Sequence, residues 1–281
     1  MERDLHIVRS LPEVRPSDTV VLTESGWTSR VYVVDNGRLV VKFPRASQVR
    51  VEYQHEEEIF CLLKTTRFEV DLPRIRYVHD DYNFIVLDGI EGNDFSTVAA
   101  ELTQAELRGI GKSIGEFLKV LHALDVPNTQ HTTIEEELDE YQEKYRLGLP
   151  AYQERLTFGE QARLRWLMEE RLPARVHELG SDLVFSHGDL GYWNVILESD
   201  GRIGVVDFGD AGYWDRSKDF LGLEDAELLD AALRVYGDDP TLRDKIEIRQ
   251  RALPVIDLPF YIGKHDDEGL ASTLARLRER L

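Results

Sequence analysis

The chain has 281 residues, of which 42% are hydrophobic, and its mean hydropathy of −0.36 is too low for an integral membrane protein. Because it carries 53 Asp and Glu against 34 Lys and Arg, its formal net charge is −19, which disfavours partners such as nucleic acid and anionic lipid. Two explanations of this charge stay open: solubility, including adaptation to a salt-tolerant host, or attraction of a cationic ligand.

The sequence gives no indication of a targeting signal or a disulfide. The first 18 residues are charged from residue 2 onward and lack the apolar core of a secretory signal peptide. Cys61 is the only cysteine, which excludes an intramolecular disulfide, and its apolar neighbours predict a buried, unreactive thiol. We therefore expect a cytoplasmic protein with no membrane partner and with the monomer as the default state.

Three short strands are predicted near the N-terminus, at residues 19–24, 30–35 and 39–44. An Asn-Gly pair at residues 36 and 37 favours a tight turn between the second and third strands. The turn between the first two strands has a single glycine, which on its own predicts a plain hairpin and only weakly indicates a phosphate-binding loop. The residues of this turn that carry the phosphate-loop hypothesis are Ser25, Gly26, Thr28 and Ser29.

Lys42 is the unusual residue of the third strand, because its ammonium group must pair with an anion or reach the edge of an otherwise apolar strand. A helix is predicted next, at about residues 47–64, and a glutamate on it can form an ion pair that holds the lysine ready for a nucleotide phosphate. Glu56 is preferred, since Phe60 and Leu63 follow it on the same helical face. The alternatives that stay open are Glu52, Glu57 and Glu58.

The character of the chain changes near residue 92. A second hairpin, at residues 74–92, has an apolar exit from Leu87 to Ile90, and helical patterns follow it, beginning with a capping box at residues 103–106. Further helices are predicted at residues 133–146, 160–179, 224–236, 240–252 and 268–280. The sequence thus predicts an α+β protein with a small β-rich domain, residues 1–92, and a larger helical domain, residues 93–281.

Polar side chains stand at both ends of one further predicted hairpin, at residues 195–206. Asp189 and Asn194 precede this hairpin, and Asp207 follows it. Because a hairpin brings its two ends together, we expect these three side chains to converge. Two carboxylates and an amide oxygen suit Mg²⁺, and a magnesium ion indicates a phosphate-bearing partner.

The residues around this hairpin resemble those of a known family. The segment from His187 to Asn194 resembles the catalytic loop of kinases, His-x-Asp with Asn five positions after the Asp, and residues 207–209, Asp-Phe-Gly, resemble their metal-binding motif. Glycine at position 188, where protein kinases have arginine, is similar to the aminoglycoside phosphotransferase family, as are the segments 207–212 and 40–45. Segment 40–45 is especially similar to the enzymes that modify the 2″-hydroxyl, and the resemblance covers about residues 20–265.

This resemblance implies a two-lobed, protein-kinase-like α+β fold, with a small antiparallel sheet in the N-terminal lobe and a larger helical C-terminal lobe. Residues 1–92 would bind the nucleotide, and residues 93–281 would supply the catalytic loop and the acceptor site. The implied co-substrate is ATP or GTP, and the implied cofactor is Mg²⁺.

The resemblance also implies roles for the matching residues. Asp189 orients the substrate hydroxyl and accepts its proton, while Asn194 and Asp207 hold Mg²⁺ against the nucleotide phosphates. Lys42 contacts the α- and β-phosphates and is positioned by a glutamate, for which Glu56 is preferred.

Other parts of the implied nucleotide site are less well defined. Backbone N–H groups of residues 25–29 would cover the phosphates, although this loop has fewer glycines than protein kinases use. The hinge from Leu87 to Ile90 would contact the base, and the choice between ATP and GTP stays open. Asp210 can belong to the site or stabilise the metal loop, whereas a structural role is preferred for Asp219.

The acceptor pocket for a polyamine sugar should be lined with carboxylates. Glu224 and Glu227, at i and i+3 of a predicted helix, resemble the acidic pair with which 2″-type enzymes bind the amines of their substrate. A solvated helix start is an equal alternative, because acidic residues favour the first turn. Lesser candidates are Asp225 and the acidic run 135–140, and Phe260 and Tyr261 are core residues or walls of the pocket.

The sequence therefore predicts a kinase of the 2″ type, which transfers the γ-phosphate of ATP or GTP to a hydroxyl of an aminoglycoside. A role in antibiotic resistance is a further inference from this predicted activity. The alternatives are a kinase of another small hydroxyl compound, such as choline, a macrolide, homoserine or a sugar, and a nucleotide-binding pseudokinase. A protein kinase is disfavoured because no Ala-Pro-Glu motif follows residue 209. The residues whose presence argues against a pseudokinase are Lys42, Asp189, Asn194 and Asp207.

Overall fold

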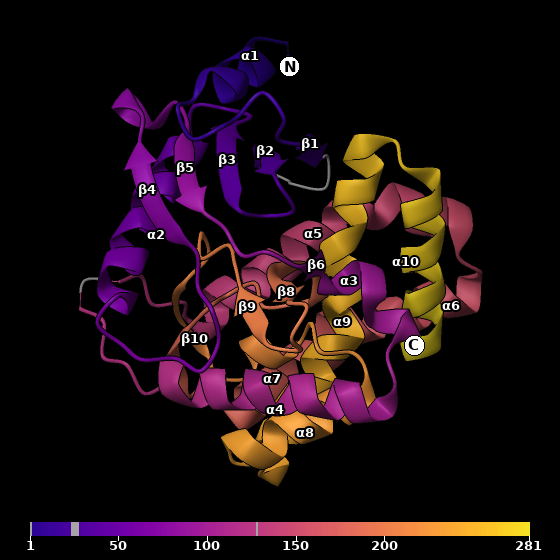
Figure 1. Ribbon diagram of the computed structural model, residues 1–281. Helices are drawn as coiled ribbons and strands as arrows, with labels where there is room; N and C mark the ends of the chain where they lie inside the picture. The colour runs from indigo at the N-terminus through magenta and orange to yellow at the C-terminus, as the bar shows by residue number, and fades with distance from the viewer. Residues whose placement is uncertain (1, 24–27, 128) are drawn as a thin grey trace. The chain divides into compact units, whose positions relative to one another are not determined.

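A five-stranded antiparallel sheet forms from the N-terminal part of the chain in the computed structural model, which describes residues 2–23, 28–127 and 129–281 (Figure 1). Across the sheet the strands follow the order β1 (Val20–Thr23), β2 (Ser29–Val34), β3 (Leu39–Pro44), β5 (Ile85–Asp88) and β4 (Arg74–Val78). The turn before β3 has positive φ at Asp35, Asn36 and Gly37, at 46°, 52° and 102°, as the predicted Asn-Gly turn requires. The strands of both predicted hairpins are present.

Helix α1 (Glu2–Ser10) was not predicted from the sequence. Only Val8 among its apolar residues is fully buried, so the sequence of this helix shows only a weak helical periodicity of apolar residues. Val8 joins a core that includes Tyr32, Val41 and Phe43 from the sheet. The N-terminal segment is therefore part of this core.

Helix α2 (Val49–Leu63) buries one face, which includes Tyr53, Glu56, Ile59, Phe60 and Leu63. Cys61 lies outside this face and is exposed. The prediction of a buried thiol is thus wrong, because the apolar neighbours of a helical residue in sequence do not share its side of the helix.

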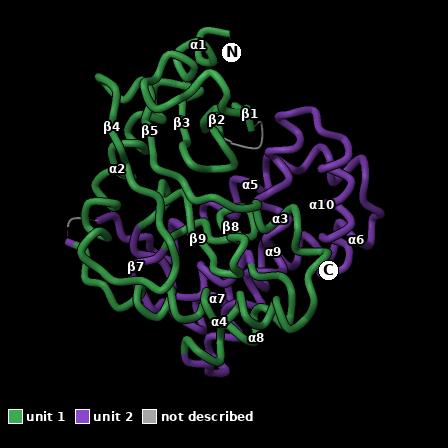
Figure 2. Tube along the Cα trace, viewed as in Figure 1, with its two compact units in different colours: residues 1–126, 187–211, 223–236 green, residues 127–186, 212–222, 237–281 purple. Residues whose placement is uncertain are grey.

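The chain divides into two compact units, each assembled from segments that are distant in sequence (Figure 2). Unit 1 comprises residues 1–126, 187–211 and 223–236, and unit 2 comprises residues 127–186, 212–222 and 237–281. The functional division of the chain at residue 92 stays a prediction. The single-turn elements are η1 (Asp80–Tyr82), η2 (Ala99–Glu101), η3 (Leu167–Arg171), η4 (Tyr192–Asn194) and η5 (Lys218–Phe220).

Unit 1 also contains a three-stranded sheet and a pair of closely packed helices. The sheet has the order β6 (Asn93–Asp94), β8 (Val195–Leu197) and β9 (Ile203–Val205), so the predicted hairpin is confirmed. Helix α4 (Gln104–Leu121) begins with the predicted capping box and packs against α8 (Ala226–Tyr236). A side chain at Gly111 would place its Cβ 2.3 Å from the Leu228 carbonyl oxygen, so glycine permits this close approach. The remaining helix is α3 (Phe95–Val98).

Unit 2 is helical, with a two-stranded antiparallel ribbon of β7 (Leu183–Ser186) and β10 (Gly212–Asp215). Its helices are α5 (Ile134–Arg155), α6 (Phe158–Trp166), α7 (Leu172–Leu179), α9 (Pro240–Lys264) and α10 (Asp267–Arg280). Helices α5 and α9 continue past their predicted ends at residues 146 and 252, because buried side chains such as Tyr152 and Leu258 extend their apolar faces. Within the described residues, no helix is both long and apolar enough to cross a membrane.

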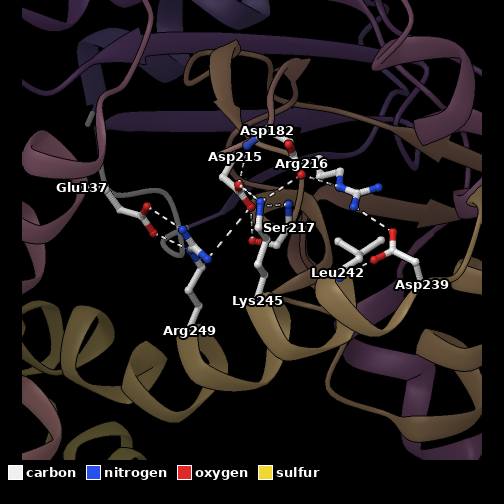
Figure 3. A network of polar contacts seen from close by, with 9 residues as sticks. All are labelled: Glu137, Asp182, Asp215, Arg216, Ser217, Asp239, Leu242, Lys245 and Arg249. Atoms are coloured by element: carbon white, nitrogen blue, oxygen red, sulfur yellow. Dashed lines mark hydrogen bonds and ion pairs between the residues drawn. The ribbon is translucent and has the colours of Figure 1, made fainter. Parts of the chain in front are cut away.

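A buried ionic network connects helix α9 to the β7–β10 ribbon within unit 2 (Figure 3). Lys245 is fully buried, and its Nζ donates to Oδ2 of Asp215 at 2.8 Å and to Oδ2 of Asp182 at 3.0 Å. Arg249 makes two hydrogen bonds to Glu137, and its Nη1 lies 4.0 Å from Oδ1 of Asp215. Burial opposes the charged form of Asp215, but Arg249 and the hydrogen bonds from Lys245 and Ser217 lower the pKa of this carboxyl below its ordinary value.

We predict that Lys245→Met lowers the free energy of unfolding by about 3–5 kcal/mol, because it removes a cation from a buried carboxylate. Urea unfolding followed by circular dichroism at neutral pH measures this loss. The matched control, Lys264→Met, changes an exposed lysine of the same helix and should cost no more than about 1 kcal/mol. Equal stability of the two variants would contradict the role given to the network.

Candidate active site

The loop from His187 to Asn194 follows strand β7 directly and is held by main-chain contacts. The buried His187 ring donates from Nε2 to the Val206 carbonyl oxygen at 3.0 Å, and its Nδ1 accepts from the Asp189 backbone N–H at 3.3 Å. Both bonds require the neutral ring with its proton on Nε2. His187 therefore ties the beginning of the loop to the far end of the β8–β9 hairpin.

Asn194 connects the end of the loop to Asp189. Its Nδ2 donates to the Asp189 main-chain oxygen at 2.8 Å and to Asp189 Oδ2 at 3.0 Å. Since a main-chain carbonyl can only accept, the nitrogen of the amide must face Asp189. The amide oxygen of Asn194 is thus the atom that can serve as a metal ligand.

Lys42 lies between two carboxylates that come from different parts of unit 1. Its Nζ donates to the two carboxylate oxygens of Glu56 at 2.9 and 3.0 Å and to Asp207 Oδ1 at 3.0 Å. The Glu56 side chain is 2% exposed and the Lys42 side chain 10%, whereas that of Asp207 is 51% exposed. Glu56 is therefore the partner of Lys42, as preferred from the sequence. The other glutamates of α2 interact elsewhere, Glu52 with Thr28, Glu57 with Tyr82 and Glu58 with Gln54.

The charges of this cluster shift one another's pKa values. Burial alone would favour neutral side chains, but Asp207 and Glu56 raise the pKa of Lys42, and the Lys42 ammonium lowers that of Asp207. The pKa of Glu56 is raised, because its burial and the nearby Asp207 outweigh the attraction of Lys42. At neutral pH, Lys42 and Asp207 are both ionised.

Asp207 is brought beside Asn194 by the pairing of the chain on either side of the hairpin. The Val206 backbone N–H donates to the Asn194 carbonyl oxygen at 3.0 Å, and Asp207 itself has a φ of 66°, rare for a residue with a side chain. Among the described residues, no three or more His, Cys, Asp or Glu side chains gather to hold a metal. Asn194 and Asp207 offer an amide oxygen and a carboxylate, and such oxygen ligands suit a cation such as Mg²⁺, which keeps several waters and takes further oxygens from a phosphate.

The predicted nucleotide loop is described only in part, whereas the predicted hinge is described completely. Ser25 and Gly26 lie outside the described residues. Ser29 is buried, and its hydroxyl accepts from Tyr53 at 2.7 Å, so this side chain already has a partner within unit 1. Thr28 is exposed. At the hinge, Leu87 is buried. Ile90 lies against Gly204, because a Cβ added to Gly204 would be 2.3 Å from Cδ1 of Ile90.

The predicted acceptor residues are not arranged as the sequence suggested. Helix α8 begins at Ala226 and is capped by Asp225, whose Oδ1 accepts from the Glu227 and Leu228 backbone N–H groups. Glu224 thus precedes the cap, and the prediction that it shares a helical face with Glu227 is wrong. Glu227 pairs with Arg108 at 3.0 Å.

Some acidic residues near this segment still face the loop after Asp189. The Asp225 backbone N–H donates to the Tyr192 hydroxyl at 3.1 Å. Burial raises the pKa of Tyr192 above its ordinary value, and the negative charges of Asp225 and Glu224 raise it further. Glu224 and Asp210 are exposed.

The acidic run 135–140, Asp219, Phe260 and Tyr261 belong to unit 2 and have structural surroundings. Within the acidic run 135–140, Glu136 closes the capping box of α5, and Glu137 binds Arg249. Asp219 is fully buried, in agreement with the structural role preferred for it. Phe260 packs on Tyr261, which in turn contacts the helical core.

Two contacts of the site were missed by sequence reasoning. The His55 ring on α2 donates from Nε2 to the Ala211 carbonyl oxygen at 2.6 Å, which binds the segment after residues 207–209 to the helix of Glu56. The Trp193 indole N–H donates to Asp189 Oδ2 at 3.2 Å. The position of Trp193 four residues after Asp189, within the kinase-like loop, was the available signal for this second contact.

Comparison with known proteins gives one family and many similar structures. A model of the phosphotransferase enzyme family matches residues 19–248. The GDP and kanamycin complex of APH(2″)-IIIa is 18% identical with a TM-score of 0.79, over 99% of this chain and 98% of that one. The gentamicin complex of APH(2″)-IIa is 18% identical with a TM-score of 0.73, over 99% and 95%. The macrolide 2′-phosphotransferase MphH from Brachybacterium faecium is 19% identical with a TM-score of 0.63, over 98% and 96%. These likenesses confirm the predicted kinase-like α+β fold.

We predict that Lys42→Met makes stability depend on the protonation of Glu56. Without the ammonium group, the folded-state pKa of Glu56 rises further above its unfolded value, so the folded protein is favoured only where Glu56 can take up a proton. The free energy of unfolding should fall by about 3 kcal/mol or more at about pH 8, and by less at about pH 5. Chemical unfolding at both pH values measures this.

The control for this experiment is the double variant Lys42→Met/Glu56→Gln, which has no carboxylate to titrate at position 56. Its loss of stability relative to the wild type should be similar at both pH values. If the single variant also loses the same amount at both, Glu56 is not the buried partner that sets the stability of this cluster.

Proposed function

This chain belongs to the phosphotransferase enzyme family, and we propose that it transfers the γ-phosphate of ATP or GTP to the 2″-hydroxyl of an aminoglycoside. That it is a phosphotransferase acting on an alcohol group follows from the family. The proposal concerns the nucleotide, the acceptor and the residues that act on them. The observation that carries it is the cluster of Lys42, Glu56 and Asp207 beside the loop of Asp189 and Asn194.

Lys42 supports binding of the nucleotide phosphates. Its ammonium group is ionised and is held between Glu56 and the half-exposed Asp207, so a phosphate oxygen can replace Asp207 as its partner. Asn194 and Asp207 would hold Mg²⁺, which when bound neutralises charge on the phosphates. Glu56 stays in place during this exchange because it is buried and bound to both Lys42 and the Phe208 backbone.

Asp189 acts on the acceptor. In the transfer, the acceptor O–H bond breaks and its proton passes to the Asp189 carboxylate, while a new bond forms between that oxygen and the γ-phosphorus. The bond from the γ-phosphorus to the bridging oxygen breaks, and the nucleoside diphosphate leaves. Asn194 and Trp193 both donate to Oδ2 of Asp189, which fixes the orientation of the carboxylate that would accept this proton.

A cationic acceptor is supported by the carboxylates near the catalytic loop. Glu224 and Asp225 lie near the Tyr192 hydroxyl, two positions before Asn194, and favour ammonium groups there. Proteins of the same fold have been solved with kanamycin and gentamicin. A macrolide is the second candidate, because macrolide 2′-phosphotransferases share the fold with TM-scores of 0.63 and 0.66.

We predict that Asp189→Asn lowers kcat about 10²- to 10⁴-fold, because the amide cannot accept the hydroxyl proton. The Michaelis constant for the nucleotide should change little, since Asp189 acts on the acceptor. Steady-state assay of nucleoside diphosphate release measures both constants, and the melting temperature checks folding. The control, Asp200→Asn in the turn of the β8–β9 hairpin, should retain wild-type turnover. Near wild-type turnover in Asp189→Asn would exclude this mechanism.

The acceptor and the nucleotide are identified by one panel. Kanamycin, gentamicin, a macrolide and choline are each incubated with ATP or GTP and Mg²⁺, and phosphate transfer is followed by mass spectrometry. We expect transfer to the aminoglycosides, with the phosphate on the 2″-oxygen in the nuclear magnetic resonance spectrum of the product. Transfer to the macrolide alone would select the second candidate, and transfer to another hydroxyl would correct the position.

A further inference from the structure

Trp193 is a half-exposed aromatic residue inside the loop that carries the proposed base. Its exposed fraction is 49%, and it lies in η4 between Asp189 and the hairpin. Burial of the apolar surface of an indole ring is strongly favourable. The exposed half of the Trp193 ring is therefore surface that a bound ligand can cover with a gain in free energy. Exposure alone does not show this, but two contacts fix the ring in place.

The first contact is with Gly191. A Cβ on Gly191 would lie 2.5 Å from Cη2 and Cζ2 of the Trp193 ring, so the ring packs directly on the glycine backbone. Gly191 has an extended backbone, with φ of −153°, which any residue can adopt. Glycine is therefore needed here for space, and the space is filled by the indole.

The second contact is the hydrogen bond from Trp193 Nε1 to Asp189 Oδ2, at 3.2 Å. Asn194 Nδ2 donates to the same oxygen at 3.0 Å. Two donors on one oxygen restrict rotation of the carboxylate. Trp193 thus has one edge directed at the base, and about half of its surface remains open to solvent.

We propose that Trp193 forms the floor of the acceptor site, where its indole face stacks on an amino-sugar ring while its N–H orients Asp189. This inference rests on the proposed function, because the ring to be stacked belongs to the acceptor. An indole face attracts both the C–H groups of a sugar ring and its ammonium groups, the latter more strongly than other aromatic side chains do. The N–H makes Trp193 a positioning residue for Asp189, and the face makes it a determinant of acceptor binding.

Two substitutions separate these roles. Trp193→Phe keeps an aromatic face but removes the N–H, so the Michaelis constant for kanamycin should change little while kcat falls about 10-fold. Trp193→Leu removes the face as well, and the Michaelis constant for kanamycin should rise about 5- to 30-fold.

The controls test whether these effects belong to this position. Gly191→Ala retains the indole but displaces it, and it should raise the Michaelis constant for kanamycin in the same direction as Trp193→Leu. Trp166→Phe alters another half-exposed tryptophan, on α6, and should leave all constants at wild-type values. The Michaelis constant for the nucleotide should be unchanged in every variant.

The outcomes distinguish this inference from the proposed function. If the wild type phosphorylates kanamycin, and Trp193→Leu and Gly191→Ala bind it as well as the wild type does, Trp193 is not the floor of the site and the proposed function stands. If the wild type transfers phosphate to no aminoglycoside, the proposed function fails and the inference fails with it. A raised Michaelis constant for kanamycin in Trp193→Leu, together with a lowered kcat at an unchanged Michaelis constant in Trp193→Phe, supports both roles.

Discussion

Lys42 is the buried cation on which the arrangement of the site depends. Its ammonium group is bound by Glu56 from α2 and by Asp207 from the segment after β9, so one nitrogen connects a strand, a helix and the Asp-Phe-Gly segment at residues 207–209. Desolvation offsets much of the attraction in such a cluster, so it adds little net stability. It constrains the geometry all the same, because separating Lys42 from Glu56 would leave a buried carboxylate without its cation. The cluster therefore defines where Asp207 lies more than it stabilises the fold.

Main-chain hydrogen bonds around the β8–β9 hairpin supply the second constraint. The Val206 N–H donates to the Asn194 carbonyl oxygen, and the Val206 carbonyl accepts from the His187 ring, so one residue holds both ends of the loop from His187 to Asn194. Asp207, the next residue, has a φ of 66°, which costs about 1–3 kcal/mol for a residue with a side chain. The paired chain on one side and Lys42 on the other enforce this conformation. The strain is thus found where the position of a carboxylate matters most.

The sequence predicted those parts of the site that short-range patterns determine. The hairpin, the loop before it and the choice of Glu56 follow from strand alternation, turn residues and one helical face, and the structure contains all three. The placement of Glu224 and Glu227 on one helical face was wrong, because the Asp225 side chain caps α8 and the helix therefore begins after Glu224. Lys245 was missed because a lysine in a helix normally faces solvent, and its partner Asp215 lies 30 residues away in sequence. No local pattern records such a contact, and the same holds for the assembly of each unit from distant segments.

The net charge of −19 is a weaker argument for a cationic acceptor than it first suggests. Many acidic residues have structural tasks that are independent of any ligand: Glu106, Glu136 and Glu160 close capping boxes, and Glu137 neutralises the buried Arg249. The charge that matters for the proposed acceptor is local. It lies near the loop from His187 to Asn194, where the carboxylates of Glu224 and Asp225 raise the pKa of Tyr192. The half-exposed indole of Trp193 follows Tyr192 in the same turn. Negative charge and an aromatic face within one short segment suit a ring that carries ammonium groups, and it is this combination, rather than overall composition, on which the proposed amino-sugar acceptor rests.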